Sequence, residues 1–436
     1  MTLGRLATPT TSSDTARVTA PTVRRQVSAH ASCRSPGAKP EFRVLVAAAR
    51  ERLDEPDRAL IRALVEDAVD WEQLLRLARH NRVEALLDHS LRATVPDAVP
   101  ESVASRLKAR ADSNRERGRR LVTELADLVR LLDGAGIPAL VFKGPVLAAQ
   151  IYEDRGLRFF WDLDLLVREE DIERVSELVM TRGYRRYSEL DRLEARIFAG
   201  YHFAHTLFHD ERDVEVDVHW RLMPAGFGPR LAWSDLSGRA IRAQLGGVDL
   251  WTFSTEDALL ALAAHGAKEE WRRLQMVCDV AGYIRSAPAL DWTTCLDRAA
   301  GFGGRRMLLL AAHLAHARLG ADLPAAVHEA IAADRVIPEL VGRVWPRLQS
   351  ADSPATSPFV LTRFRYLVLD RVRDRLRYAR EALMEPRLVH VRLLRLPPAL
   401  SKGYVLVRIV HDYLLLPLWL LAKRCRRLAN KWAARQ

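Results

Sequence analysis

The sequence predicts an α+β fold in which a small mixed sheet with helices is embedded between N-terminal and C-terminal helical regions. Apolar residues recur at helical spacing through residues 41–132 and again from Thr255 onward. Between them, short apolar runs alternate with amphipathic stretches and Gly turns. A chain of 436 residues also exceeds one compact core, which indicates several domains. The predicted divisions are a disordered extension at 1–40, a helical region at 41–134, a central palm domain at 135–250, a second helical domain at 251–396 and a basic amphipathic helix at 397–436.

The N-terminal extension is rich in Thr, Ser, Ala, Pro and Arg and has no apolar stretch of the kind found in signal peptides. It is therefore expected to be disordered. In the helical region that follows, one stripe contains Trp71, Leu74 and Leu77, and a later stripe contains Leu121, Leu125 and Leu128. The later stripe ends at Asp133-Gly134, a typical helix stop.

The central region changes period from helix to strand at Ile137. Its predicted strands are Ile137–Phe142, Leu163–Val167, Thr206–His209 and Val214–Trp220. Its predicted helices are Val146–Tyr152, which follows a proline suited to a first helical turn, and Glu169–Arg182.

Two carboxylates open the second of these strands. Side chains alternate faces along a strand, so Asp162 and Asp164 point the same way, where they repel each other unless a cation lies between them. Two or three carboxylates suffice for Mg²⁺, which prefers oxygen ligands. Asp217 is the expected third ligand because it is central in its strand, and Glu215 is the reserve candidate. His219, on the same face, is expected to pack or to orient a neighbour rather than to act as a base.

A turn at Lys143-Gly144 follows the first strand and precedes a helix. Such a turn brings backbone N–H groups and the positive end of a helix to a phosphate. Lys143 and Arg158 would add positive charge. The plainer alternatives are that the Lys-Gly pair only ends a strand and that Arg158 pairs structurally with Asp162.

These motifs together resemble a family of uncharacterised bacterial nucleotidyltransferases within the DNA polymerase β-like superfamily, over residues 45–320. The resemblance rests on Phe142-Lys143-Gly144, Tyr152, Arg158, Asp162-Leu163-Asp164-Leu165-Leu166-Val167, Gly183-Tyr184, Asp217-Val218-His219-Trp220, His265-Gly266-Ala267-Lys268, Trp271, Leu274 and Asp279, and on Trp71, Leu74, Ala78 and Arg82 before them.

The resemblance implies a polymerase β-like palm that transfers a nucleoside monophosphate from an NTP, ATP being expected, to an unidentified acceptor. It implies two Mg²⁺ ions, with Asp162, Asp164 and Asp217 as catalytic ligands. Most of the superfamily has Gly-Ser or Gly-Gly at the phosphate turn, whereas this chain has Lys143-Gly144-Pro145 and lacks the serine hydroxyl. The alternative is therefore an inactive nucleotide-binding or partner-binding module that retains the fold.

Three basic side chains are expected to share one helical face after the palm: His265, Lys268 and Arg272. His265 and Lys268 would bind the nucleotide by closing over the triphosphate or the base; otherwise they form an ordinary polar face. Asp279, two turns further on, is expected to pair with a basic residue.

The net charge of +12 is concentrated near the C-terminus. Residues 361–436 hold 18 Lys and Arg against 5 Asp and Glu, so the rest of the chain is nearly neutral. A neutral palm argues against nucleic acid as a partner and against polynucleotide extension. The four cysteines are scattered, which fits a reducing cytoplasm.

The C-terminal element from Tyr404 to Ala422 is apolar but contains Arg408, His411 and Asp412. These charges argue against a transmembrane helix. The segment is followed by basic residues, so peripheral membrane contact is one interpretation. The other is a helix packed on the helical domain with its basic end in solvent.

Overall fold

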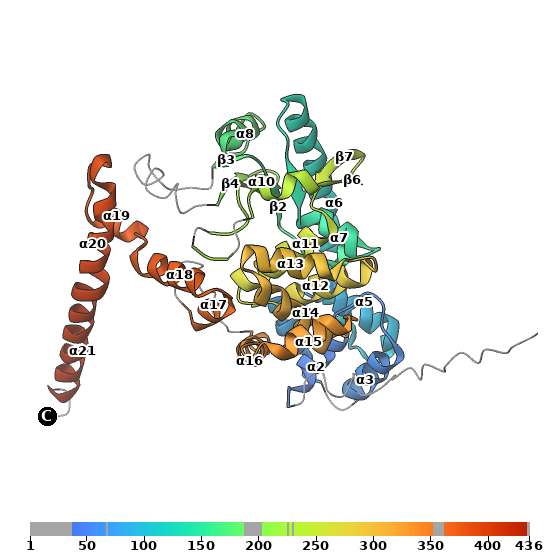
Figure 1. Ribbon diagram of the computed structural model, residues 1–436. Helices are drawn as coiled ribbons and strands as arrows, with labels where there is room; N and C mark the ends of the chain where they lie inside the picture. The colour runs from blue at the N-terminus through green and yellow to red at the C-terminus, as the bar shows by residue number, and fades with distance from the viewer. Residues whose placement is uncertain are drawn as a thin grey trace, which may run out of the picture.

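The computed structural model describes residues 37–66, 69–186, 203–224, 226–228, 231–351 and 362–433. The predicted α+β class is confirmed, because one mixed seven-stranded sheet lies among flanking helices in these residues (Figure 1). The predicted disordered extension lies almost wholly outside the described residues.

The sheet has the order β3-β4-β5-β2-β1-β7-β6. Two of its pairings are parallel, β2 with β5 and β1 with β7, and the others are antiparallel. The strands are β1 (Leu140–Phe142), β2 (Asp162–Leu166), β3 (Arg185–Arg186), β4 (Ala204–His209), β5 (Val214–His219), β6 (Ile241–Leu245) and β7 (Val248–Thr252).

Helices precede, interrupt and follow the sheet (Figure 1). The first group is α2 (Pro40–Ala47), α3 (Glu55–Glu66), α4 (Trp71–Asn81), α5 (Glu84–Thr94) and the long α6 (Glu101–Gly134). Within the sheet region lie α7 (Gly144–Ile151), α8 (Ile172–Met180) and α10 (Trp233–Leu236). The second group is α11 (Thr255–Lys268), α12 (Leu274–Ser286), α13 (Trp292–Phe302), α14 (Arg305–Leu319), α15 (Ala325–Ala333), α16 (Ile337–Leu348), α17 (Arg363–Val368), α18 (Val372–Met384), α19 (Leu388–Leu393), α20 (Tyr404–Val410) and α21 (Leu416–Ala433).

Strand alternation gives the sheet two different faces. One face packs its apolar side chains, such as Leu163, Leu165 and Val216, against α6 and α8 in a core of its own. The opposite face carries Asp162, Asp164 and Asp217 and faces α11 and α12, because the side chains at these positions alternate with the apolar ones. The alternation therefore keeps the carboxylates out of the apolar core.

The β6–β7 hairpin is an element that the sequence analysis did not predict. Its two-residue turn, Gly246-Gly247, has φ of 60° and 74°. Positive φ at both central positions is the geometry that matches the twist of a hairpin, and glycine adopts it without strain. The Gly-Gly pair between two apolar runs was thus an available signal. β7 runs through residue 250, where the sequence placed the end of the palm domain.

The C-terminal helices project away from the rest of the molecule (Figure 1). Helix α21 continues from α20 through a π-helical turn, His411–Leu415. In length and composition, Ala399–Lys423 is apolar enough to cross a membrane, and only 6% of its most apolar window is buried. The alternative of a helix packed on the helical domain is not what these residues show, since Leu414, Leu418 and Trp419 are each more than half exposed.

Gly266 in α11 faces the ring of Trp271, which is fully buried. A Cβ at residue 266 would lie 2.5 Å from that ring. Gly266→Ala is expected to lower the free energy of unfolding by about 1–3 kcal/mol, because a packed core cannot absorb the extra methyl group without strain. Urea denaturation followed by circular dichroism measures this change.

Gly301→Ala is the matched control, because Gly301 also lies in a helix but a Cβ there would meet nothing within 4 Å. This variant is expected to be neutral or slightly stabilising. Equal unfolding curves for the two variants would contradict the packing argument.

Candidate active site

The predicted acids meet on one face of the sheet because β2 and β5 are parallel and in register. Asp164 lies opposite Asp217, and Asp162 lies opposite Glu215. Thr206 of β4 is the next residue across from Asp217 and donates a hydrogen bond to its Oδ1 at 2.5 Å. Three neighbouring strands thus supply the floor of the candidate site.

Asp164 is buried and has two basic neighbours. Lys143 Nζ lies 3.2 Å from Asp164 Oδ1, and His219 Nε2 lies 3.1 Å from the same oxygen and donates to it when it carries the proton. Burial alone would raise the pKa of Asp164, yet the charge of Lys143 and the bond from His219 hold that pKa far below its usual value. Asp164 is therefore ionised, and His219 orients it as the sequence predicted.

Unlike Asp164, the neighbouring acids Asp162 and Glu215 have raised pKa values. Burial and the neighbouring charge of Asp164 raise the pKa of Asp162. Burial, followed by Asp217, Asp162 and Asp164, raises the pKa of Glu215 to about 7. Raised values on clustered carboxylates mean that the site disfavours further negative charge and favours a cation.

The donor set fits a hard divalent cation. Ligand atoms of Asp164, Asp217 and His219 all lie within 4.8 Å of one another, and Asp162 is on the same strand face two residues before Asp164. Carboxylate oxygens are the ligands that Mg²⁺ prefers, and His219 is already engaged in orienting one of them. Of the three predicted metal ligands, the structure brings Asp164 and Asp217 within this distance of each other.

The turn between β1 and α7 has an unusual backbone. Lys143 and Gly144 have φ of 51° and 41°. A Cβ at residue 144 would lie 3.1 Å from the carbonyl oxygen of Asp162, so the turn approaches β2 closely. This backbone places Lys143 over Asp164 and starts α7 at the edge of the site, as the phosphate-turn interpretation requires.

Arg158 has a partner other than the one that the sequence suggested. It makes a bidentate ion pair with Asp279 of α12, at 2.8 and 2.9 Å, and also donates to the carbonyl of Gly144 at 3.3 Å. Both charged side chains are buried. The expectation that Asp279 pairs with a basic residue agrees with this contact, whereas the alternative pairing of Arg158 with Asp162 does not.

His265 and Lys268 of α11 face the acids across the cavity, as predicted. Arg272 also lines the cavity, but the expectation that it shares their helical face is wrong, because α11 ends at Lys268. The Nδ1 atom of His265 is buried and has no hydrogen-bond partner among the described residues. Burial and the surrounding Lys143 and Lys268 hold the pKa of His265 well below its usual value, so it is neutral. Lys268 Nζ lies 4.8 Å from the centre of the Phe203 ring. These groups are placed to meet a polar ligand.

All these side chains except Glu215 line one cavity of about 430 Å³, a size suited to a small-molecule ligand. Several of its wall residues were not predicted from the sequence, because their positions depend on tertiary packing. Arg82 appeared only within the resemblance, although it ends α4 in a left-handed conformation, with φ of 57°, that turns it toward the cavity. Other wall residues that were not predicted include Phe203, Thr206, Glu269 and Arg273.

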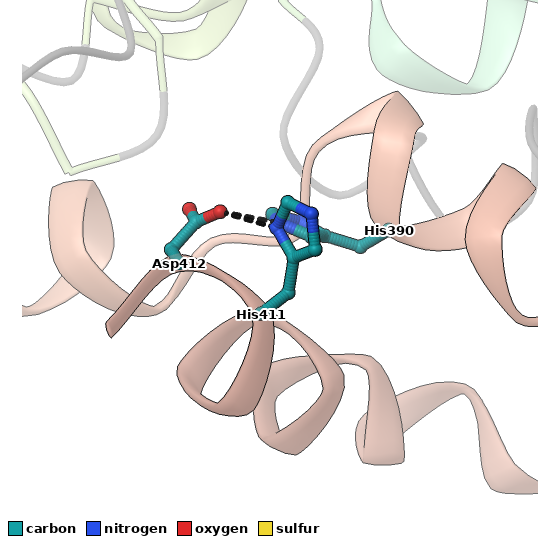
Figure 2. Close-up of side chains that lie close together, drawn as sticks. All are labelled: His390, His411 and Asp412. Atoms are coloured by element: carbon teal, nitrogen blue, oxygen red, sulfur yellow. Dashed lines mark hydrogen bonds and ion pairs between the residues drawn. The ribbon is translucent and has the colours of Figure 1, made fainter. Parts of the chain in front are cut away.

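A second group of possible ligands lies far along the chain, in the C-terminal helices. Figure 2 shows His390 and His411 turned toward Asp412. The two rings lie 3.0 and 2.8 Å from Asp412 Oδ1, and Arg408 Nε lies 3.3 Å from Oδ2. Because a guanidinium already balances this carboxylate, the group acts as a polar tie between α19 and the π-helical turn.

Strand-borne carboxylates that face a cavity rimmed with basic groups fit a nucleotidyltransferase. Residues 67–320 match the family described as uncharacterised nucleotidyltransferase, and the chain belongs to that family. The expected resemblance is thus confirmed. No curated protein and no solved structure is detectably similar to the chain.

Lys143→Met tests whether this lysine balances the acids. The variant is expected to unfold at a lower temperature than the wild type in EDTA, because four carboxylates then face each other with one cation fewer. Added Mg²⁺ is expected to restore more stability to the variant than to the wild type. Thermal unfolding with and without Mg²⁺ measures both effects.

Lys268→Met is the control, because Lys268 lines the same cavity but contacts Phe203 and Glu269. A Mg²⁺ response of equal size in both variants would contradict the specific pairing of Lys143 with Asp164.

Proposed function

We propose that the protein is a Mg²⁺-dependent enzyme that transfers a nucleoside monophosphate from an NTP, with ATP as the expected donor, to an acceptor hydroxyl, phosphate or phenol. One observation carries the proposal: Asp162, Asp164 and Asp217 share one sheet face at the floor of the cavity. Carboxylates grouped in this way serve to hold metal ions in phosphoryl and nucleotidyl transfer.

Asp162, Asp164 and Asp217 would hold two Mg²⁺ ions, which stabilise negative charge on the phosphates when bound. Lys143, Lys268 and the N-terminus of α7 surround the space above them and would bind the triphosphate. Lys143 is suited to exchange partners, since its ammonium group contacts Asp164 and can turn to a phosphate oxygen. The unpartnered Nδ1 of His265 offers a further hydrogen bond to the nucleotide.

In the reaction, an acceptor oxygen forms a bond to the α-phosphorus. The bond from that phosphorus to the oxygen bridging the α- and β-phosphates breaks, and pyrophosphate leaves with the electron pair. Asp217 takes the acceptor proton where the acceptor is a hydroxyl. Rate acceleration then comes mainly from positioning and from the electrostatics of the site.

A second candidate function is nucleotide or partner binding without turnover. The contact between Lys143 and Asp164 supports it, because an ammonium group balances the acid where catalysis needs a metal. The two functions differ in one observable: only the enzyme releases pyrophosphate.

Isothermal titration with ATP, CTP, GTP and UTP, each with and without Mg²⁺, tests the proposal. The wild type is expected to bind one NTP in a Mg²⁺-dependent manner. Asp162→Ala/Asp164→Ala is expected to lose that binding by at least tenfold, since each lost charged contact removes roughly 1.5–3 kcal/mol.

Asp127→Ala/Asp210→Ala is the control, because it removes two exposed acids away from the site. A folded wild type that binds no NTP would contradict the proposal. Binding without pyrophosphate release in the presence of candidate acceptors would favour the second function.

We propose that the protein is located in the cytoplasm. The cysteines support it, since Cys278, Cys295 and Cys425 are all free thiols.

A further inference from the structure

A second cavity of about 300 Å³ lies beside the 430 Å³ cavity that contains the acids. The two share Arg82, Phe159 and Arg273 as wall residues. A ligand in the second cavity would therefore lie next to the acids across a common wall. We call this second cavity the arginine pocket, after the residues Arg79, Arg82, Arg110, Arg117 and Arg273 that line it.

The arginine pocket has more positive charge than its own carboxylate can balance. Glu84 is the one acid among its lining residues, and Arg110 Nε lies 3.9 Å from it. Arg117 forms an ion pair with Asp213, which lies outside the pocket, at 3.3 Å between Nη1 and Oδ2. Arg273 donates to the carbonyl of His80 at 2.7 Å, a neutral partner. Several guanidinium groups so close together are stable where an anion joins them.

Aromatic rings hold two of these guanidinium groups in place. Arg117 lies over the Trp161 ring at 3.7 Å, and Arg82 lies over the Phe159 ring at 5.0 Å. The two rings stack on each other at 6.5 Å. Stacking fixes the planar groups while leaving their N–H donors available, which is how arginine recognises phosphate and carboxylate groups.

We propose that the arginine pocket binds the anionic group of the acceptor, a phosphate or a carboxylate on a small molecule. The proposal rests on the proposed function, because it assigns the pocket to the second substrate. The acceptor would be anchored in the arginine pocket and would present its nucleophilic oxygen past Arg82 toward Asp162 and Asp217. The NTP would occupy the larger cavity with its triphosphate against Lys143 and Lys268.

The experiment uses the full chain loaded with Mg²⁺ and its NTP, into which inorganic phosphate or succinate is titrated as the probe. The wild type is expected to bind one of the two, which distinguishes phosphate from carboxylate recognition. Arg79→Ala/Arg110→Ala is expected to weaken probe binding at least tenfold, because both side chains line the pocket and both are solvent-accessible, so the fold does not depend on them. Its Mg²⁺-NTP binding is expected to remain unchanged.

Arg119→Ala/Arg130→Ala is the control with the same change of charge on α6, outside the pocket. Equal weakening in the two double variants would overturn the proposal, as would a wild type that binds neither probe. Competition of the probe with the NTP would also overturn it, since the arginine pocket would then belong to the nucleotide. A wild type that binds the probe but binds no Mg²⁺-NTP would instead refute the proposed function.

A separate observation concerns the apolar segment Tyr413–Leu421 in the C-terminal helix. Its residues Tyr413, Leu414, Leu415, Leu416, Leu418, Trp419 and Leu421 are between 37% and 63% exposed. Four of them are consecutive, so apolar side chains point in all directions around the helix. A helix that is apolar all round belongs in a core or in lipid.

The charged residues before this segment are satisfied within the protein. Arg408 is buried and donates to the carbonyls of Glu385 and Ala382, while Asp412 accepts from His390 (Figure 2). After the segment, Lys423 and Arg426 are exposed and basic. An apolar helix with a basic end complements a bilayer that has an anionic surface.

We infer that Tyr413–Leu421 inserts into a lipid bilayer with anionic headgroups. The test is flotation of the full chain with vesicles of phosphatidylcholine alone or mixed with phosphatidylglycerol. The wild type is expected to float with the mixed vesicles. Leu414→Glu/Leu418→Glu is expected to reduce the floated fraction at least tenfold, because buried carboxylates oppose insertion.

Val372→Glu/Leu376→Glu is the matched control, since both residues are exposed on α18 outside the segment. A wild type that floats with neither vesicle would overturn the inference. So would a glutamate variant that floats like the wild type. Light scattering that shows a dimer of the wild type and a monomer of Leu414→Glu/Leu418→Glu would also overturn it, since the segment would then pack against a second copy of the chain.

Discussion

Repulsion among carboxylates on one sheet face is the constraint on which the rest of the site depends. Asp164 and Asp217 are cross-strand neighbours, and Asp162 lies two residues away. Lys143 from the turn after β1 and His219 from β5 both contact Asp164 and offset this repulsion. Further out, Lys268 at the end of α11 and Arg272 and Arg273 in the loop before α12 form the wall opposite the acids. The positions of these basic groups follow from the need to balance the acids.

The central strands and their acidic face were predictable because strand alternation is a local property of the sequence. The pattern of β2 alone placed Asp162 and Asp164 together, and that of β5 singled out Asp217. The fold class followed from where the helical period stopped and resumed. The β6–β7 hairpin was missed although Gly246-Gly247 was a readable turn signal. Its parallel pairing with β1 joins residues more than a hundred positions apart, which no local pattern encodes.

The walls of the site could not be predicted in the same way. Arg158 and Asp279 are 121 residues apart, and nothing near either residue indicates the other. Arg82 reaches the cavity because α4 ends there in a left-handed turn, and its place depends on how α4 packs. The arginine pocket has the same origin, because it combines α4, α5 and α6 with the loop before β2 and with Arg273, which precedes α12. Long-range packing decides which charges meet.

The Arg158–Asp279 pair also decides how the cleft can move. Arg158 donates to the carbonyl of Gly144, at the start of α7, and pairs with Asp279 of α12, so it links these two elements. Both charges of the pair are buried. Separating them would leave two unpaired charges in a low-dielectric interior, at a cost of about 3–5 kcal/mol. The pair therefore opposes any motion that would part the turn at the start of α7 from α12, and it favours a cleft whose two walls move together.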